Sequence, residues 1–248
     1  MEIIPTKIRD CFIIKPTIHN DNRGYFFESF NEKEFTEKTG LQINFVQDNQ
    51  SYSRGIVLRG LHFQKGKHAQ AKLVKVAKGS VYDVAVDLRV DSPTFGEYVG
   101  VELNDSNCEQ LFIPRGCAHG FATLNDDGTI LQYKCDNYYC KEADGGISWK
   151  DESINIDWFD NISIYSQLIM SEKDKNLSPI APYVFKLIRE RIDFDKKRHD
   201  VLDYLNNNYA NLSDYERDLI KKQENIMREY YDILTERLTT IELPWDEN

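Results

Sequence analysis

The sequence has little of what a membrane protein, a nucleic-acid-binding protein or a disulfide-stabilised scaffold requires. None of its apolar runs approaches the roughly 20 residues that a membrane-spanning helix needs. Its 31 basic and 41 acidic residues give a formal net charge of -10, which offers no general attraction to a polyanionic backbone. Five cysteines, an odd number with no CxxC pair, favour reduced thiols. The first residues also lack a secretion-signal pattern, so we expect a cytoplasmic protein that binds neither membranes nor nucleic acids.

Glycine is absent after Gly146, because all 13 glycines fall between Gly24 and Gly146. Residues that reach left-handed turn conformations cheaply are therefore confined to the first part of the chain. In that part, short β-rich runs alternate with turn signals, which is typical of an all-β sandwich or barrel. The runs are Leu73 to Ala77, Val81 to Leu88, Tyr98 to Leu103 and Thr129 to Tyr133.

The run from Val81 to Leu88 has the alternation of a strand with two unlike faces. One face carries four large apolar or aromatic side chains, and the other carries Asp83 and Asp87. The pattern predicts that the first of these faces belongs to the core.

The last part of the chain, from about Tyr183, has the composition of helices. Ser213 followed by Glu216 has the spacing of a capping box. Apolar residues then recur every seven positions, which predicts an amphipathic helix docked on its own domain or on a second copy. With Pro179 and Pro182 as a junction, we expect a domain over residues 1–182 and a helical extension over residues 183–248. The seven-residue series is Ile220, Met227, Leu234 and Ile241.

Three clusters of polar and ionisable residues lie among the strand-like runs. The first extends from Gln47 to Ser53 and is followed by Arg59, His62 and Lys72, which fall within fourteen positions of one another. These three side chains could bind an anion, abstract a proton and stabilise an oxyanion. The two later clusters are Ile113 to Phe121, which contains His119, and Tyr133 to Tyr139.

Seven short segments in a fixed order carry a family resemblance. They are Asp21 to Glu28, Val57 to Gln64, Gln70 to Val74, Asp83 to Arg89, Ser92 to Gly96, Ile113 to Phe121 and Ser171 to Asp174. In residues and in order they resemble the dTDP-4-dehydrorhamnose 3,5-epimerase family. The resemblance covers residues 1–182 and leaves the helical extension outside.

This resemblance implies a mainly β protein, a cupin-type jelly-roll β-barrel with the C-terminal helices added. It also implies a homodimer without a metal or another cofactor. The implied substrate is a nucleotide-linked 4-keto-6-deoxy sugar, epimerised at C3, C5 or both. Such a reaction belongs to nucleotide-sugar biosynthesis, as in the dTDP-rhamnose pathway that supplies lipopolysaccharide or capsule.

The family's site residues can be carried over position by position. His62 would be the general base, and Asp174 the carboxylate that orients it. Tyr133 would be the acid on the opposite face, while Lys72 with Arg59 would stabilise the developing negative charge. Tyr139 rather than Tyr138 would stack on the nucleobase. The other positions that would line the substrate site are Arg23, Phe26, Glu28, Gln47, Asn49 and His119.

Epimerisation next to a ketone requires a base, an acid and a group that stabilises negative charge. Inverting a carbon next to a carbonyl requires removal of a proton to give an enolate and return of a proton from the other side. A histidine with a pKa of about 6.5 is a competent base at neutral pH, and a tyrosine with a pKa of about 10 remains protonated and can donate. Fixed positive charge in a dry interior stabilises the enolate oxygen.

Other functions remain open at this point. A metal-dependent cupin could use His62, His68 and His119 as ligands, although Gln64 stands where such enzymes have a second histidine. A non-catalytic sugar-nucleotide-binding cupin is the second rival. Among enzymes, a single-site 5- or 3-epimerase or an enzyme of GDP-linked 4-keto-heptoses shares the scaffold, and the fold does not decide among them.

Overall fold

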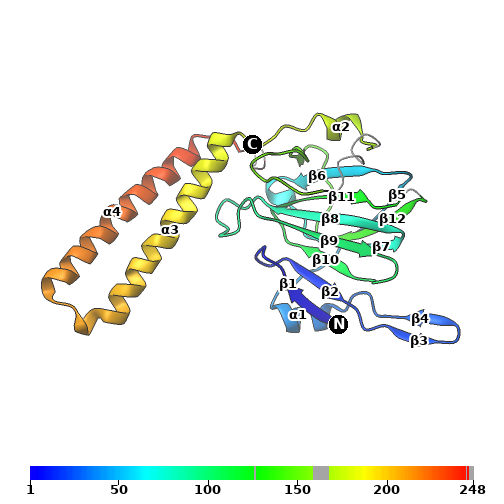
Figure 1. Ribbon diagram of the computed structural model, residues 1–248, viewed down its shortest axis with the longest axis horizontal. Helices are drawn as coiled ribbons and strands as arrows, with labels where there is room; N and C mark the ends of the chain where they lie inside the picture. The colour runs from blue at the N-terminus through cyan, green and yellow to red at the C-terminus, as the bar shows by residue number, and fades with distance from the viewer. Residues whose placement is uncertain (126, 159–167, 244, 246–248) are drawn as a thin grey trace.

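Two antiparallel sheets form the centre of the computed structural model, which describes residues 1–125, 127–158, 168–243 and 245 (Figure 1). The first sheet has six strands in the order β1-β2-β10-β7-β12-β5. Their bounds are β1 (Glu2–Pro5), β2 (Phe12–Lys15), β10 (Gln110–Ile113), β7 (Lys72–Lys78), β12 (Thr129–Cys135) and β5 (Gln47–Ser53). The second sheet has the order β13-β6-β11-β8-β9. Its strands are β13 (Asp144–Gly146), β6 (Leu58–Gln64), β11 (Cys117–Thr123), β8 (Ser80–Asp87) and β9 (Tyr98–Asn104).

Apolar side chains from both sheets fill the space between them. Val74 and Leu131 come from the six-stranded sheet, and Val81, Ala85 and Phe121 come from the five-stranded sheet. This arrangement confirms the predicted jelly-roll barrel, and the four strand-like runs lie in β7, β8, β9 and β12.

Strand β8 is buried on both faces, so the expectation of one core face was incomplete. Asp83 and Asp87 are fully buried. Each carboxylate has partners, as burial of a charge requires: Asp83 Oδ1 lies 2.8 Å from His119 Nε2, and Asp87 accepts hydrogen bonds from Arg89 and Ser92. The alternation of β8 therefore separates the face that points between the two sheets from the opposite face, which is also buried.

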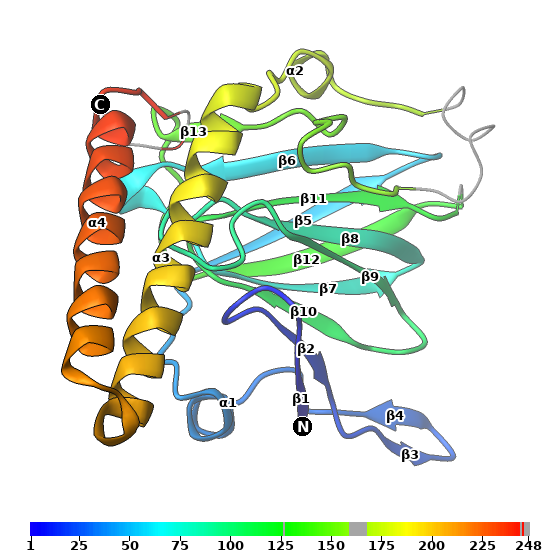
Figure 2. The same cartoon turned by 60° about the vertical axis from the view of Figure 1, so that its left-hand side comes forward.

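The C-terminal helices, α3 (Pro182–Asn208) and α4 (Asp214–Thr239), pack against the barrel near the start of α3 and the end of α4, where Leu187, Ile188 and Leu238 join its buried cluster. Figure 2 shows them side by side as an antiparallel hairpin, and Figure 1 shows that this hairpin projects away from the barrel. The helix prediction is confirmed, including the reciprocal Ser213–Glu216 capping box. In the predicted apolar series, Leu234 is buried and Ile220 is half-buried.

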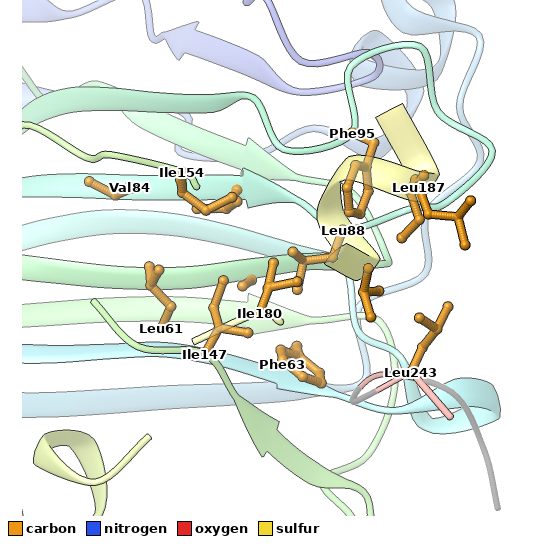
Figure 3. Packing of buried hydrophobic residues seen from close by; sticks show 14 of the residues in the cluster. Leu61, Phe63, Val84, Leu88, Phe95, Ile147, Ile154, Ile180, Leu187 and Leu243 are labelled. Carbon is orange, nitrogen blue, oxygen red and sulfur yellow. The ribbon is translucent and has the colours of Figure 1, made fainter. Parts of the chain in front are cut away.

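Helix α3 docks on the barrel through a mixed apolar and polar contact. Leu187 joins a buried cluster with Phe63, Leu88 and Phe95 (Figure 3). The Arg191 guanidinium, almost fully buried, donates to the carbonyl of Val90 at 2.8 Å and to the Asp91 carboxylate at 2.5 Å. These bonds give the buried charge the partners it needs.

Gly96, the last residue of the Ser92 to Gly96 segment, lies against α3, and this position explains why the segment ends in glycine. Its φ of +78° is in the left-handed region. A Cβ atom there would come within 2.5 Å of the Phe185 ring of α3. Glycine is therefore required both by the turn and by the close packing of the helix.

Two smaller elements sit beside the six-stranded sheet. Helix α1 (Glu32–Thr39) buries Phe35 against Phe112 of β10. Strands β3 (His19–Asp21) and β4 (Gly24–Phe26) form a separate two-stranded arm that projects from the body of the protein (Figure 1). Within the described ranges, no helix is both long enough and apolar enough to cross a membrane.

We expect Leu187→Ala to lower the free energy of unfolding by about 2–5 kcal/mol, because it opens a cavity between α3 and the barrel. Leu219→Ala is the matched control, since that leucine on α4 is 48% exposed and should change stability by less than about 0.5 kcal/mol. Urea unfolding followed by circular dichroism measures both. Equal effects would mean that α3 does not depend on this contact.

Candidate active site

A cavity of about 680 Å³ opens between the two sheets and contains most of the predicted site residues. The five-stranded sheet contributes Arg59 and His62 from β6 and His119 from β11, while the six-stranded sheet contributes Lys72 and Tyr133. The remaining predicted residues in its lining are Gln47, Asn49, Tyr139 and Asp174. Residues far apart in the sequence thus converge on one polar interior space.

An irregularity in β6 brings Arg59 and His62 to the same cavity. His119 pairs with His62 and Phe121 pairs with Arg59, so three steps along β6 match two steps along β11. Such a bulge re-aims side chains, which simple alternation would place on opposite faces. It is centred on Gly60, whose φ is +123° and whose Cβ would lie 2.5 Å from the Cα of Gly120.

The strongest contact in the cavity joins His62 to Asp174. His62 Nε2 lies 2.5 Å from Asp174 Oδ1, and the Asp174 side chain is only 5% exposed. Asp174 belongs to the short helix α2 (Glu172–Lys175), whose N-cap Ser171 accepts a hydrogen bond from the Asp174 backbone. Although burial acts to raise the pKa of Asp174, the hydrogen bond from His62 holds that pKa below its usual value. The carboxylate therefore stays charged and fixes the imidazole ring.

Lys72 and Tyr133 face this pair from the other sheet. The Lys72 Nζ atom lies 5.8 Å from the centroid of the Tyr133 ring. Burial lowers the pKa of Lys72, although Cys135 and Asp83 act in the opposite direction. Burial also raises the pKa of Tyr133, so its hydroxyl keeps its proton at neutral pH. The cavity thus has a possible base on one side and a possible acid on the other.

A second histidine–carboxylate pair was not predicted. His119 Nε2 lies 2.8 Å from Asp83 Oδ1, and both side chains are buried. Burial lowers the pKa of His119, while Asp83 opposes this shift. The other Asp83 oxygen is buried without a partner in the described part of the chain, as is Ser51 Oγ in the cavity lining. The alternation of β8 could have signalled Asp83, because it places a carboxylate on the interior face.

Several predicted binding residues also hold one another. Arg59 donates to Ser53 Oγ at 3.2 Å and to the carbonyl of Tyr52 at 3.0 Å. Gln47 Nε2 donates to Asn49 Oδ1 at 3.0 Å. These contacts fix the polar ends of the side chains along the cavity wall.

Of the two candidate stacking residues, Tyr139 lines the cavity and Tyr138 does not. The Tyr139 hydroxyl donates to Asp144 at 3.3 Å, and Asp144 also forms an ion pair with Lys173. Asp144 and Lys173 both line the cavity and were missed in the sequence. Lys173 directly precedes Asp174, so its position was a signal that could have found it.

Three predicted substrate residues lie away from the cavity of their own chain. Arg23 is on the projecting arm, where it is paired with Asp21 at 2.6 Å. Phe26, the last residue of β4, is 71% exposed. Glu28 is exposed and accepts hydrogen bonds from Asn31. None of the three lines the cavity described above.

The rival metal site of the sequence analysis has no supporting geometry. No group of three or more histidine, cysteine, aspartate or glutamate side chains among the described residues is arranged to hold a metal ion. His68, the third candidate ligand, is absent from the cavity lining that contains His62 and His119.

A jelly-roll barrel with a polar cavity between its two sheets is the architecture of a cupin-type protein. A family model described as dTDP-4-dehydrorhamnose 3,5-epimerase matches residues 5–181. The chain belongs to this family, which confirms the resemblance found in the sequence. A second model, described as Sequestin, matches residues 181–240, which contain all of α3 and α4.

Individual relatives agree with this assignment. The dTDP-4-dehydrorhamnose 3,5-epimerase of Escherichia coli K12 is 50% identical over 177 residues, or 71% of this chain and 93% of the relative. The crystal structure of the same enzyme from Elizabethkingia anophelis has a TM-score of 0.68 and 51% identity, covering 72% of this chain and 96% of that one. A Legionella pneumophila epimerase in complex with dTDP-4-keto-L-rhamnose has a TM-score of 0.67 and 42% identity, covering 77% and 96%. These relatives are sugar-nucleotide isomerases by their names.

We expect Asp83→Asn to lower the pKa of His119 further, because the substitution removes the charge that opposes the effect of burial. A pH titration of the His119 ring nitrogens by NMR measures the shift. Asp87→Asn is the matched control: it removes another buried carboxylate of β8 that is bonded to Arg89 instead of to His119. A His119 pKa that rises or stays unchanged in Asp83→Asn would contradict the proposed electrostatic role of Asp83.

Proposed function

We propose that this chain epimerises a dTDP-linked 4-keto-6-deoxy sugar at C3 and C5 by proton abstraction and return. The observation that carries the proposal is the His62–Asp174 pair, which faces Lys72 and Tyr133 of the other sheet across one cavity. Relatives about half identical to this chain are named 3,5-epimerases, which favours inversion at both carbons over a single-site enzyme. The Legionella complex favours a dTDP-linked sugar over a GDP-linked one.

In the proposed mechanism, His62 removes the proton from a carbon next to the ketone. Nε2 is already engaged by Asp174, so Nδ1 would accept the proton while Asp174 stabilises the imidazolium that forms. The electrons of the broken C–H bond move into the enolate, whose oxygen becomes negative. Tyr133 would then return a proton to the opposite face of the same carbon, giving the inverted centre.

Lys72 and Arg59 would stabilise the enolate oxygen. Lys72 is 9% exposed, and in such an interior a fixed positive charge acts more strongly than it does in water. Because burial lowers its pKa, Lys72 loses its proton at a lower pH than an exposed lysine does. The proposed stabilisation is therefore present below that pKa and lost as the pH rises through it.

The experiment that tests the function is incubation with dTDP-4-keto-6-deoxyglucose in D₂O, followed by NMR. We expect deuterium at C3 and C5 and inverted product, with and without a chelator, since each step is assigned to a side chain. His62→Asn should reduce both signals by at least about 10²-fold while binding dTDP with nearly unchanged affinity. Activity on a GDP-linked 4-keto sugar instead, or exchange that survives in His62→Asn, would contradict the assignment.

We also propose that the protein works as a homodimer in which the β3–β4 arm of one copy completes the cavity of the other. Arg23, Phe26 and Glu28 resemble the family's substrate residues, yet they lie on or next to an exposed arm outside their own cavity. An exposed pair of aromatic side chains, Tyr25 and Phe26, suits burial against a second copy. A dimer explains both observations with one contact.

Mixing two inactive variants tests this arrangement. Arg23→Ala damages the arm and His62→Asn damages the cavity, so each homodimer should be weakly active. In the mixed dimer, the intact arm of the His62→Asn copy would serve the intact cavity of the Arg23→Ala copy, restoring about one quarter of the normal rate for random pairing. No recovery after subunit exchange, verified by mass spectrometry, would mean that the arm serves its own chain.

For the division of the chain, we propose that residues 1–182 contain all of the chemistry. The family model ends at residue 181, and every residue assigned to a catalytic step precedes it. Residues 183–248 would then act as a helical extension, which contacts the barrel through the start of α3 and the end of α4.

A further inference from the structure

The segment that carries Tyr139 is held almost entirely by side chains. It connects β12 to β13 without a strand or helix of its own. The backbone N–H of Tyr139 donates to Gln47 Oε1 at 3.0 Å, and the next N–H, of Cys140, donates to Gln64 Oε1 at 2.7 Å. The carbonyl of Asn137 accepts from Gln70 Nε2 at 2.8 Å. Three glutamine side chains thus bind three of the four residues from 137 to 140.

These glutamines come from separate parts of the barrel. Gln47 begins β5, Gln64 ends β6, and Gln70 precedes β7. Gln64 and Gln70 are 7% and 9% exposed, and burying a side-chain amide is unfavourable unless it is hydrogen-bonded. The hydrogen bonds of Gln64 and Gln70 to residues 137–140 therefore offset the cost of burying their amides.

Apolar burial contributes little to fixing this segment. Tyr138 is 66% exposed and Tyr139 is 54% exposed. A ring that stacks on a nucleobase must keep its plane and its height above the base, and stacking weakens when either changes. The geometry of the ring therefore depends on hydrogen bonds, namely those of the backbone to the glutamines and that of the Tyr139 hydroxyl to Asp144.

We propose that Gln64 and Gln70 are positioning residues for the nucleotide, which act by presenting the ring of Tyr139 at the cavity. The inference rests on the proposed function, because it needs a dTDP-linked substrate whose base meets Tyr139. His62 and Gln64 are two residues apart on β6 and both line the cavity. Strand β6 thus carries both the proposed base that acts on the sugar and a glutamine that positions the ring for the nucleobase.

The test uses Gln64→Met and Gln70→Met, which keep the length of the side chain and remove the hydrogen bond. We expect each to raise the Kd for dTDP about tenfold in calorimetry, since part of the base stacking is lost. The affinity for inorganic pyrophosphate, which has no base, should stay the same. In the epimerisation assay, KM should rise with little change in kcat.

Gln132→Met is the matched control. Gln132 donates to Gln50 Oε1 at 2.8 Å and is absent from the cavity lining, so its removal costs one side-chain amide bond but leaves the Tyr139 segment untouched. We expect a Kd for dTDP within about twofold of the unaltered chain. Thermal unfolding of all three variants separates a loss of stability from a loss of binding.

A double-mutant cycle shows whether the glutamines act through the ring. In a Tyr139→Leu background, Gln64→Met should weaken dTDP binding by less than about twofold, because the stacking is already gone. The inference is overturned by additive effects in that cycle, by equal loss of pyrophosphate binding, or by dTDP binding as tight as in Gln132→Met. If the unaltered chain itself does not bind dTDP, the proposed function fails together with the inference.

Discussion

The close approach of β6 and β11 at Gly60 and Gly120 is the constraint on which the site depends. No side chain fits between these glycines, because a Cβ on either one would meet the backbone of the other strand below 3 Å. The bulge that results turns Arg59 into the cavity beside His62 and sets His62 opposite His119. The position of the proposed base is therefore fixed by backbone packing, and Asp174 then fixes the orientation of its ring.

Burial gives the polar groups of the cavity their chemical character. Burial lowers the pKa values of Lys72 and His119, so both release a proton more readily, and it raises the pKa of Tyr133, which keeps its proton at neutral pH. The same burial would make unpaired charges costly, and the carboxylates Asp83 and Asp174 each pair with a histidine. On the other side of the five-stranded sheet, Ile147, Ile154 and Trp158 belong to the same buried cluster as the start of α3 and the end of α4. The packing of the two sheets thus determines both the stability of the barrel and the pKa values of the groups in its cavity.

Sequence patterns predicted the elements well because local alternation and capping signals decide them. The strands around Val81 to Leu88 and the capped helix after Ser213 are examples. The family motifs also located His62, Tyr133 and Asp174, whose convergence on one cavity follows from long-range strand pairing. Asp83, Asp144 and Lys173 were missed because the contacts of Asp83 with His119, and of Asp144 with Tyr139 and Lys173, form only in the folded chain. The alternation of β8 and the position of Lys173 before Asp174 were the signals that the sequence offered. The position of Arg23 outside the cavity could not be predicted from a motif, since a motif does not show where its residues lie in the folded chain.

The central claim is that His62 and Tyr133 act from opposite faces of the sugar, and Tyr133→Phe tests it most directly. This substitution keeps the ring and removes only the hydroxyl that would return the proton. In D₂O, with a saturating dTDP-4-keto sugar, the account predicts that ring protons still exchange with solvent while inverted product falls by at least about 10²-fold. Equal loss of exchange and inversion, measured in the same NMR samples, would contradict it and leave Tyr133 as a residue that only shapes the cavity.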